Sequence, residues 1–167
     1  MKLIAYNSRF NRDIFNLFYN TVHYVNCRDY NKDQLDAWAR EDTDLDEWAG
    51  KLASNYSRLV KMNGRIVGFI ALDKTGYLDL LYVHKDYQDL GVASLLLEDA
   101  LDYARKNKIE SISSHVSITA RPFFQRRGFK LVEENTVELN NIKLENFLME
   151  KRLIESAESQ DQAEDEK

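Results

Sequence analysis

The sequence has little proline, cysteine and glycine. Its 167 residues include one proline, one cysteine and six glycines. Such a composition excludes a collagen-like or low-complexity chain, and a single cysteine, Cys27, excludes an intramolecular disulfide and fits a reducing compartment. An apolar core must therefore hold the fold, and nine Tyr, eight Phe and two Trp help to supply one.

A long apolar run is also missing. No stretch approaches the roughly 20 apolar residues that cross a membrane. Residues 1–13, MKLIAYNSRFNRD, lack the apolar centre of a signal peptide. We therefore expect a soluble, cytoplasmic protein that does not engage a membrane.

Acidic residues are in excess only at the end of the chain. The formal net charge is −5, and residues 155–167, with six acidic residues and one lysine, account for all of it. The balanced remainder argues against nucleic-acid binding, which needs a basic surface. We expect one domain over residues 1–154, followed by an acidic, disordered tail over 155–167.

The hydrophobic periodicity predicts an α/β fold with a mixed sheet. We expect helices at residues 12–25, 31–39, 44–53, 92–106 and 119–128. We expect strands at residues 2–6, 57–62, 65–73, 77–83, 111–116, 129–135 and 143–153. Asn63-Gly64 between two β-rich runs predicts a hairpin. A right-handed crossover through the helix at 92–106 would make the strands on either side of it parallel neighbours.

One glycine lies between an apolar strand and an apolar helix, in the segment YQDLGVAS (87–94). Gly91 permits a left-handed backbone or a close approach to a ligand. The first N–H groups of the following helix lack intrahelical partners and lie at its positive end, so the loop predicts an anion site, with phosphate the usual ligand. The alternative is that the glycine serves only the geometry of the turn. The spacing fits neither a P-loop nor a dinucleotide fingerprint.

The pattern Gln88-x-x-Gly91-x-Ala93 after an apolar strand resembles the pyrophosphate-binding motif of the GCN5-related N-acetyltransferases (GNAT family). The segment RPFFQRRGFKLV (121–132) is similar to the family's later F-Y-x-x-x-G-F segment. Residues 137–151 resemble the end of its small bacterial members. The resemblance covers about residues 3–153.

This resemblance implies a GNAT-like acyl-CoA N-acyltransferase fold: a mostly antiparallel sheet, helices on both faces, and fourth and fifth strands that begin parallel and splay. In the family, the pantetheine arm of acetyl-CoA (coenzyme A) fills that gap, because unpaired buried backbone groups are costly. The residues that the resemblance assigns to cofactor binding are Leu81, Tyr82, Val83, Gln88, Asp89, Leu90, Gly91, Val92, Ala93, Ser94, Ser117, Phe124 and Arg127. Of these, Arg127 is equally explained as a solvated surface charge. We expect no metal.

The implied reaction is the transfer of an acetyl group from acetyl-CoA to a primary amine of a small molecule or peptide, by direct attack in a ternary complex. Phe124 occupies the position where the family commonly has a proton-donating tyrosine. Either the thiolate leaves unassisted, or another group protonates it, with Tyr82 and His115 as the candidate acids. Asp79, expected on the strand face of Leu81 and Val83, is the candidate base, acting through water. The alternative for Asp79 is that it is paired with another residue or exposed. The alternative for His115 is a structural role.

The acceptor is expected against the first helices, where Tyr24, Tyr30 and Trp38 would line its site or belong to the core. Trp48, in an amphipathic helix, is expected in the core. Two alternatives to N-acetyl transfer stay open: a catalytically silent acyl-CoA-binding or sensing module, suggested by Phe124, and a larger acyl donor. The sequence also leaves open whether the protein forms a homodimer.

Overall fold

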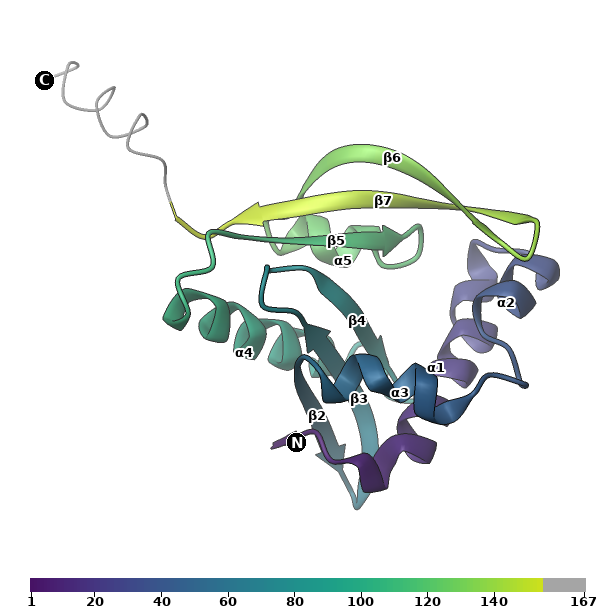
Figure 1. Ribbon diagram of the computed structural model, residues 1–167, viewed down its shortest axis with the longest axis horizontal. Helices are drawn as coiled ribbons and strands as arrows, with labels where there is room; N and C mark the ends of the chain where they lie inside the picture. The colour runs from purple at the N-terminus through teal and green to yellow at the C-terminus, as the bar shows by residue number, and fades with distance from the viewer. Residues whose placement is uncertain (155–167) are drawn as a thin grey trace, which may run out of the picture.

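Two antiparallel sheets form the centre of the protein in the computed structural model (Figure 1). The first sheet has the order β1-β2-β3-β4, with β1 at Lys2–Ala5, β2 at Tyr56–Met62, β3 at Arg65–Leu72 and β4 at Leu78–Val83. The second has the order β5-β7-β6, with β5 at Ser111–Ser117, β7 at Ile142–Arg152 and β6 at Lys130–Leu139. The structure describes residues 1–154, so the expected tail at 155–167 lies outside the described residues.

Helices cover both faces of the first sheet. The helical segments are η1 (Ser8–Phe10), α1 (Asn11–Tyr24), η2 (Asn26–Arg28), α2 (Lys32–Trp38), α3 (Leu45–Ala53), α4 (Val92–Lys106) and α5 (Arg121–Arg126). One buried cluster joins α4 to the sheet, and a second joins α1 and α3 to its other face. The predicted α/β architecture with helices on both faces is confirmed. No helix within residues 1–154 has the length and apolar character needed to cross a membrane.

Local signals in the sequence explain several of these elements. Asn31 accepts a hydrogen bond from the Gln34 N–H at 2.9 Å, and the Gln34 side chain accepts one from the Asn31 N–H, which makes a capping box at the start of α2. Asn63 and Gly64 both have positive φ, 51° and 77°, as the predicted two-residue hairpin between β2 and β3 requires.

The predicted parallel pairing of the fourth and fifth strands is not formed. Within residues 1–154, β4 and β5 meet at one parallel bridge, between Tyr77 and Ser113. Just beyond it the Ser114 hydroxyl, rather than a strand amide, donates to the Leu78 carbonyl at 2.7 Å. Because β5 pairs along its length with β7, the sheet divides here, and β4 and β5 are edge strands of separate sheets.

A bulge in β4 reverses the predicted orientation of Asp79. Leu72 lies opposite Leu78 while Ala71 lies opposite Leu80, so Asp79 is the extra residue. Leu78 consequently packs in the α4 cluster and Leu80 in the α1–α3 cluster. The prediction that Asp79 shares the face of Leu81 and Val83 is wrong. Those two side chains pack on the α4 side, whereas Asp79 lies 3.7 Å from Lys51 of α3.

Candidate active site

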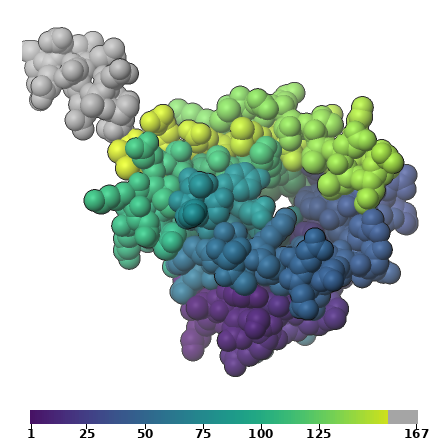
Figure 2. All heavy atoms as spheres, in the orientation of Figure 1, coloured from purple at the N-terminus to yellow at the C-terminus, as the bar shows by residue number. Residues whose placement is uncertain are grey.

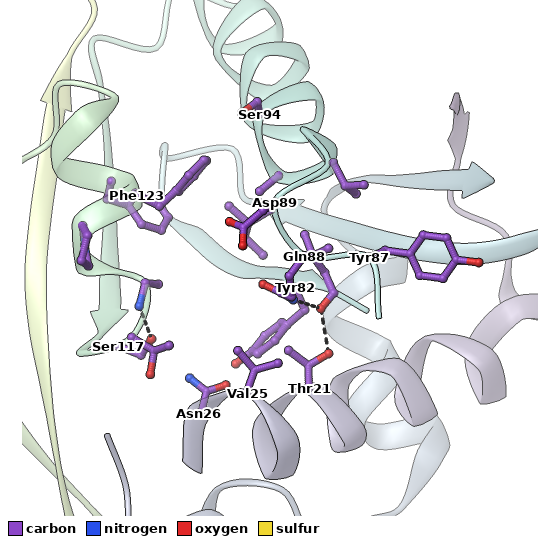
Figure 3. A pocket seen from close by; sticks show the side chains of 18 of the residues that line it. Thr21, Val25, Asn26, Tyr82, Tyr87, Gln88, Asp89, Ser94, Ser117 and Phe123 are labelled. Atoms are coloured by element: carbon purple, nitrogen blue, oxygen red, sulfur yellow. Dashed lines mark hydrogen bonds between the residues drawn. The ribbon is translucent and has the colours of Figure 1, made fainter. Parts of the chain in front are cut away.

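Two cavities meet beside the open edge of β4, and Tyr82 and Ser117 line both of them. The first has a volume of about 500 Å³ and is formed by the end of β4, the loop before α4, the start of α4 and the region of α5. We call it the loop cavity. The second, the aromatic cavity, has a volume of about 320 Å³ and is formed by α1, α2, α3 and the β6–β7 hairpin. Figure 3 shows the loop cavity, with Ser94 and Ser117 at its opposite ends.

The start of α4 directs free amides into the loop cavity. Gly91 is the residue before the helix and has the left-handed φ of 84° that glycine adopts without strain. The first intrahelical bond here joins the Leu95 N–H to the Gly91 carbonyl at 3.0 Å. The N–H groups of residues 92–94 precede it and have no helical acceptor. These amides and the positive end of the helix lie where the sequence predicts an anion site.

Gln88 fixes this loop to the end of β4. Its Nε2 donates to the Val83 carbonyl at 2.7 Å and approaches the His84 carbonyl at 3.3 Å. The Thr21 hydroxyl donates to the same Val83 oxygen at 2.8 Å. The side chain of Gln88 is therefore committed to the main chain of the protein, a role that the motif alone did not reveal.

The open edge of β4 presents main-chain groups to the same cavity. The His84 N–H donates to the Val67 carbonyl of β3 at 2.8 Å. Since successive residues of a strand alternate in direction, the N–H groups of Leu81 and Val83 point away from β3. Tyr82, which lies opposite Phe69, directs its main chain to β3 instead. Of the three residues predicted to supply the edge, Leu81 and Val83 have main-chain N–H groups free of β3, and Tyr82 does not.

Arginines lie at the far end of the loop cavity. Arg127 donates from Nη2 to the Ser94 hydroxyl, its Nη1 lies 3.3 Å from Glu98, and its guanidinium lies 5.5 Å from the ring centre of Phe123. Arg28 and Arg126 also line this cavity.

The other residues predicted to bind the cofactor occupy different environments. Asp89 lines the loop cavity and, like Gly91, has a left-handed backbone, with φ at 59°. Phe124 lines the wall but is only 4% exposed, since it packs edge-to-face on Phe129. Leu90 is 51% exposed and does not contribute to the lining.

Five aromatic side chains from different parts of the fold wall the aromatic cavity: Phe18, Tyr30, Trp38, Trp48 and Tyr82. The Phe18 ring lies 5.0 Å from that of Tyr82 and 5.1 Å from that of Trp48, between centroids. Burial raises the pKa of Tyr82, the charge of Asp79 adds to this effect, and the Trp38 side chain opposes it. The Tyr82 hydroxyl therefore stays protonated at neutral pH.

Two polar residues that line the aromatic cavity, Asp79 and His115, each lie beside a partner. Asp79 pairs with Lys51, so its partner is a lysine of α3. Tyr77 and Nδ1 of His115 are 2.8 Å apart. Burial raises the pKa of Tyr77, and the charge of Asp79 contributes. The Tyr77 hydroxyl and the His115 imidazole therefore share a hydrogen bond, which leaves Nε2 as the ring nitrogen without this partner.

The three residues predicted to line the site of the amine acceptor lie in different environments. Trp38 lines the aromatic cavity. The Tyr30 ring does too, but its hydroxyl accepts from the Ile118 N–H at 3.0 Å and donates to the Glu145 carbonyl at 2.6 Å, which joins the end of β5 to β7. Tyr24 is 65% exposed and lines neither cavity. Trp48, expected in the core, packs against the buried cluster of α1 and α3 and also lines the aromatic cavity, a second role that periodicity alone does not show.

Comparisons with known proteins agree with this geometry. The family described as "Acetyltransferase (GNAT) domain" matches residues 26–153. YafP of Escherichia coli K12, an N-acetyltransferase that is itself uncharacterized, is 35% identical over 122 residues, which cover 73% of this chain and 76% of YafP. The crystal structure of a GCN5-related N-acetyltransferase from Rhodopseudomonas palustris superposes with a TM-score of 0.88 at 28% identity, covering 91% of this chain and 95% of that one.

A more distant structure shares the fold. The PaiA N-acetyltransferase of Thermoplasma acidophilum, solved in complex with coenzyme A, has a TM-score of 0.76 at 16% identity, covering 90% of this chain and 98% of its own. The chain belongs to the GNAT acetyltransferase family, as its motif predicted. It is an N-acetyltransferase, and the predicted GNAT fold is confirmed apart from the parallel strand pair.

Proposed function

We propose that this protein transfers the acetyl group of acetyl-CoA to a primary amine of a small molecule or peptide, by direct attack in a ternary complex. The observation that carries the proposal is that the loop cavity and the aromatic cavity share Tyr82 and Ser117. A donor in the first and an acceptor in the second would meet there with their reacting ends adjacent. Such positioning contributes a large part of the rate in two-substrate reactions.

The residues of the loop cavity fit coenzyme A. The amides of residues 92–94 and the guanidinium of Arg127 suit a pyrophosphate, which is a multiply charged anion. The N–H groups of Leu81 and Val83 suit the amide carbonyls of a pantetheine arm. Acetyl-CoA supplies the acetyl group as an activated thioester.

The chemistry needs one proton acceptor and one proton donor. The amine nitrogen forms a bond to the acetyl carbon and loses a proton, while the carbon–sulfur bond breaks and the sulfur gains one. We assign Asp79, acting through water, as the acceptor, because its carboxyl group lies in the aromatic cavity, 3.7 Å from Lys51. We assign Tyr82 as the donor to sulfur, because it stays protonated and reaches both cavities. His115, which also lines the aromatic cavity, is the second candidate donor.

Thiol release tests the proposal. Purified protein, acetyl-CoA and a panel of primary amines are mixed, and free coenzyme A is followed with a thiol reagent while the acetylated amine is identified by mass spectrometry. Saturable, amine-dependent release is the expected result. One observation favours a second candidate, a catalytically silent acyl-CoA-binding module: the buried Phe124 has no hydroxyl to donate. Thermal stabilisation by coenzyme A without turnover of any amine would support that module instead.

A further inference from the structure

We propose that the acceptor is a small monoamine with an aromatic body, bound in the aromatic cavity with its amine toward Tyr82 and Ser117. This rests on the proposed function and specifies its substrate. The composition of the cavity wall, its charge and its closure by the β6–β7 hairpin each point to this class.

The wall is built for a flat apolar group. The cavity-lining rings of Trp38 and Trp48 are partly exposed, so part of their surface is available to a ligand. Trp48 is held in place by a ring of α1, because Phe15 packs edge-to-face on it at 5.3 Å. Trp38 is held in the same way by Tyr30, also at 5.3 Å. Rings fixed in this manner give geometrically specific contacts to another aromatic ring, beyond the gain from burying its area.

The charge of the cavity argues against polycations and acids. Its one partly buried carboxylate, Asp79, is paired with Lys51, and its other acid, Glu145, is exposed. A carboxylate that already has a lysine partner gives little net attraction to further cations, so the cavity suits an acceptor with a single amine. A polyamine would need several carboxylates, and an acidic acceptor would need an unpaired cation.

The β6–β7 hairpin limits the length of the acceptor. Val137, Leu139 and Leu144 line the aromatic cavity from this hairpin. The hairpin is tied down by hydrogen bonds from Gln34 to the Lys143 carbonyl at 3.0 Å and from Tyr30 to the Glu145 carbonyl at 2.6 Å. Figure 2 shows an opening on this face between α2–α3, in blue, and the yellow-green hairpin. A volume of about 320 Å³ is at the small end of ligand sites.

The chain provides its own probe for this site. Its two tryptophans, Trp38 and Trp48, both line the aromatic cavity, and neither lines the loop cavity. Tryptophan fluorescence therefore reports ligands in the aromatic cavity without any need for turnover. Titration with 2-phenylethylamine, spermidine and a glycine dipeptide, with coenzyme A present and absent, separates the classes.

We expect a saturable fluorescence change with 2-phenylethylamine, and a kcat/KM for it that exceeds that of the other two amines by at least about tenfold. Trp48→Leu should raise KM for 2-phenylethylamine about tenfold, while Tyr24→Leu, at an exposed aromatic outside both cavities, should leave it unchanged. Turnover of spermidine or the dipeptide in preference to 2-phenylethylamine would overturn this inference and leave the proposed function intact. An absence of any fluorescence change with 2-phenylethylamine at millimolar concentration would also overturn it. Loss of the proposed function itself would appear separately, as an absence of coenzyme A release with every amine tested.

Discussion

The side-chain amide of Gln88 donates to the main-chain carbonyl of Val83 at 2.7 Å, and the Thr21 hydroxyl donates to the same oxygen at 2.8 Å. This shared acceptor joins three elements: α1, the end of β4 and the loop that begins α4. The Val83 carbonyl is thereby satisfied within the protein, and the N–H of Val83, which points away from β3, is left on the side of the loop cavity. Gln88, which the sequence assigned to cofactor binding, thus holds the loop before α4 to the end of β4.

Removing the Gln88 side chain should weaken cofactor binding, because the loop before α4 loses a hydrogen bond to the end of β4. Gln88→Ala deletes one donor to Val83 and should lower the free energy of unfolding by about 1 kcal/mol and weaken acetyl-CoA binding severalfold. Thr21→Val deletes the other donor and keeps the shape of the side chain. Urea denaturation and calorimetry on the single and double variants measure the coupling between them. Strict additivity of the two losses would contradict a shared acceptor.

Tyr82→Phe should separate binding from chemistry. The substitution keeps the ring contact with Phe18 but removes the proton donor, so kcat should fall about 10²-fold while the affinity for acetyl-CoA is retained. Because the pKa of Tyr82 is raised by burial, its hydroxyl should cause no alkaline loss of activity below about pH 10. A wild-type kcat in Tyr82→Phe would show that another group protonates the sulfur.

His84 should make the fold less stable in acid. Burial lowers the pKa of His84, Arg65 and Lys85 act in the same direction, and Asp86 opposes them. Its Nδ1 also accepts the Asp86 N–H at 3.1 Å, which requires an unprotonated nitrogen. With the folded-state pKa below the unfolded value of about 6.5, the unfolded chain takes up the proton first, so stability is complete above about pH 6.5 and is lost as the pH falls below it.

The measurement for His84 is urea denaturation between pH 5 and pH 8. His84→Asn keeps an acceptor for the Asp86 N–H but does not titrate, so its stability should fall less in acid than that of the wild type. His115→Asn, at an exposed histidine outside this loop, serves as the control. Identical pH dependence in wild type and His84→Asn would refute the role given to this imidazole.

Gly76 should be intolerant of a side chain where the two sheets meet. Its φ is 95°, and a Cβ there would lie 2.3 Å from the Ser111 carbonyl oxygen. Gly76→Ala should therefore lower the free energy of unfolding by about 2 kcal/mol or more. A Cβ added at Gly50 of α3 would have nothing within 4 Å, so Gly50→Ala should instead raise it by roughly 0.5–1 kcal/mol. Equal stability of the two variants would be inconsistent with the tight junction at Gly76.

Local signals in the sequence predicted the elements well. Helix α4 begins and ends where the periodicity placed it, at Val92 and Lys106, because its apolar stripes and the preceding glycine are encoded within the segment. The hairpin at Asn63-Gly64 follows from turn chemistry alone. The position of the loop cavity could also be predicted, since the main-chain amides at the start of α4 have directions that follow from the secondary structure.

Properties that depend on distant partners could not be predicted. Whether β5 pairs with β4 or only with β7 is a choice between long-range partners that no local pattern encodes. The bulge at Asp79 depends on the register against β3, and a shift of one residue moves a side chain to the other face. Periodicity predicts that the Trp48 side chain points inward. Nothing within one helix shows that other elements leave an open space beside it.

The central claim is that main-chain groups at Gly91 and the open edge of β4 bind coenzyme A. Isothermal titration calorimetry of acetyl-CoA into wild type, Gly91→Glu and Gly64→Glu tests it most directly. Both glycines have positive φ and open surroundings, but Gly64 lies in the β2–β3 turn, so the two substitutions carry a comparable backbone cost. With folding checked by circular dichroism, we predict saturable binding for wild type and Gly64→Glu, and affinity at least about 10²-fold weaker, equivalent to about 2.7 kcal/mol, for Gly91→Glu. Undiminished binding to folded Gly91→Glu would contradict the claim.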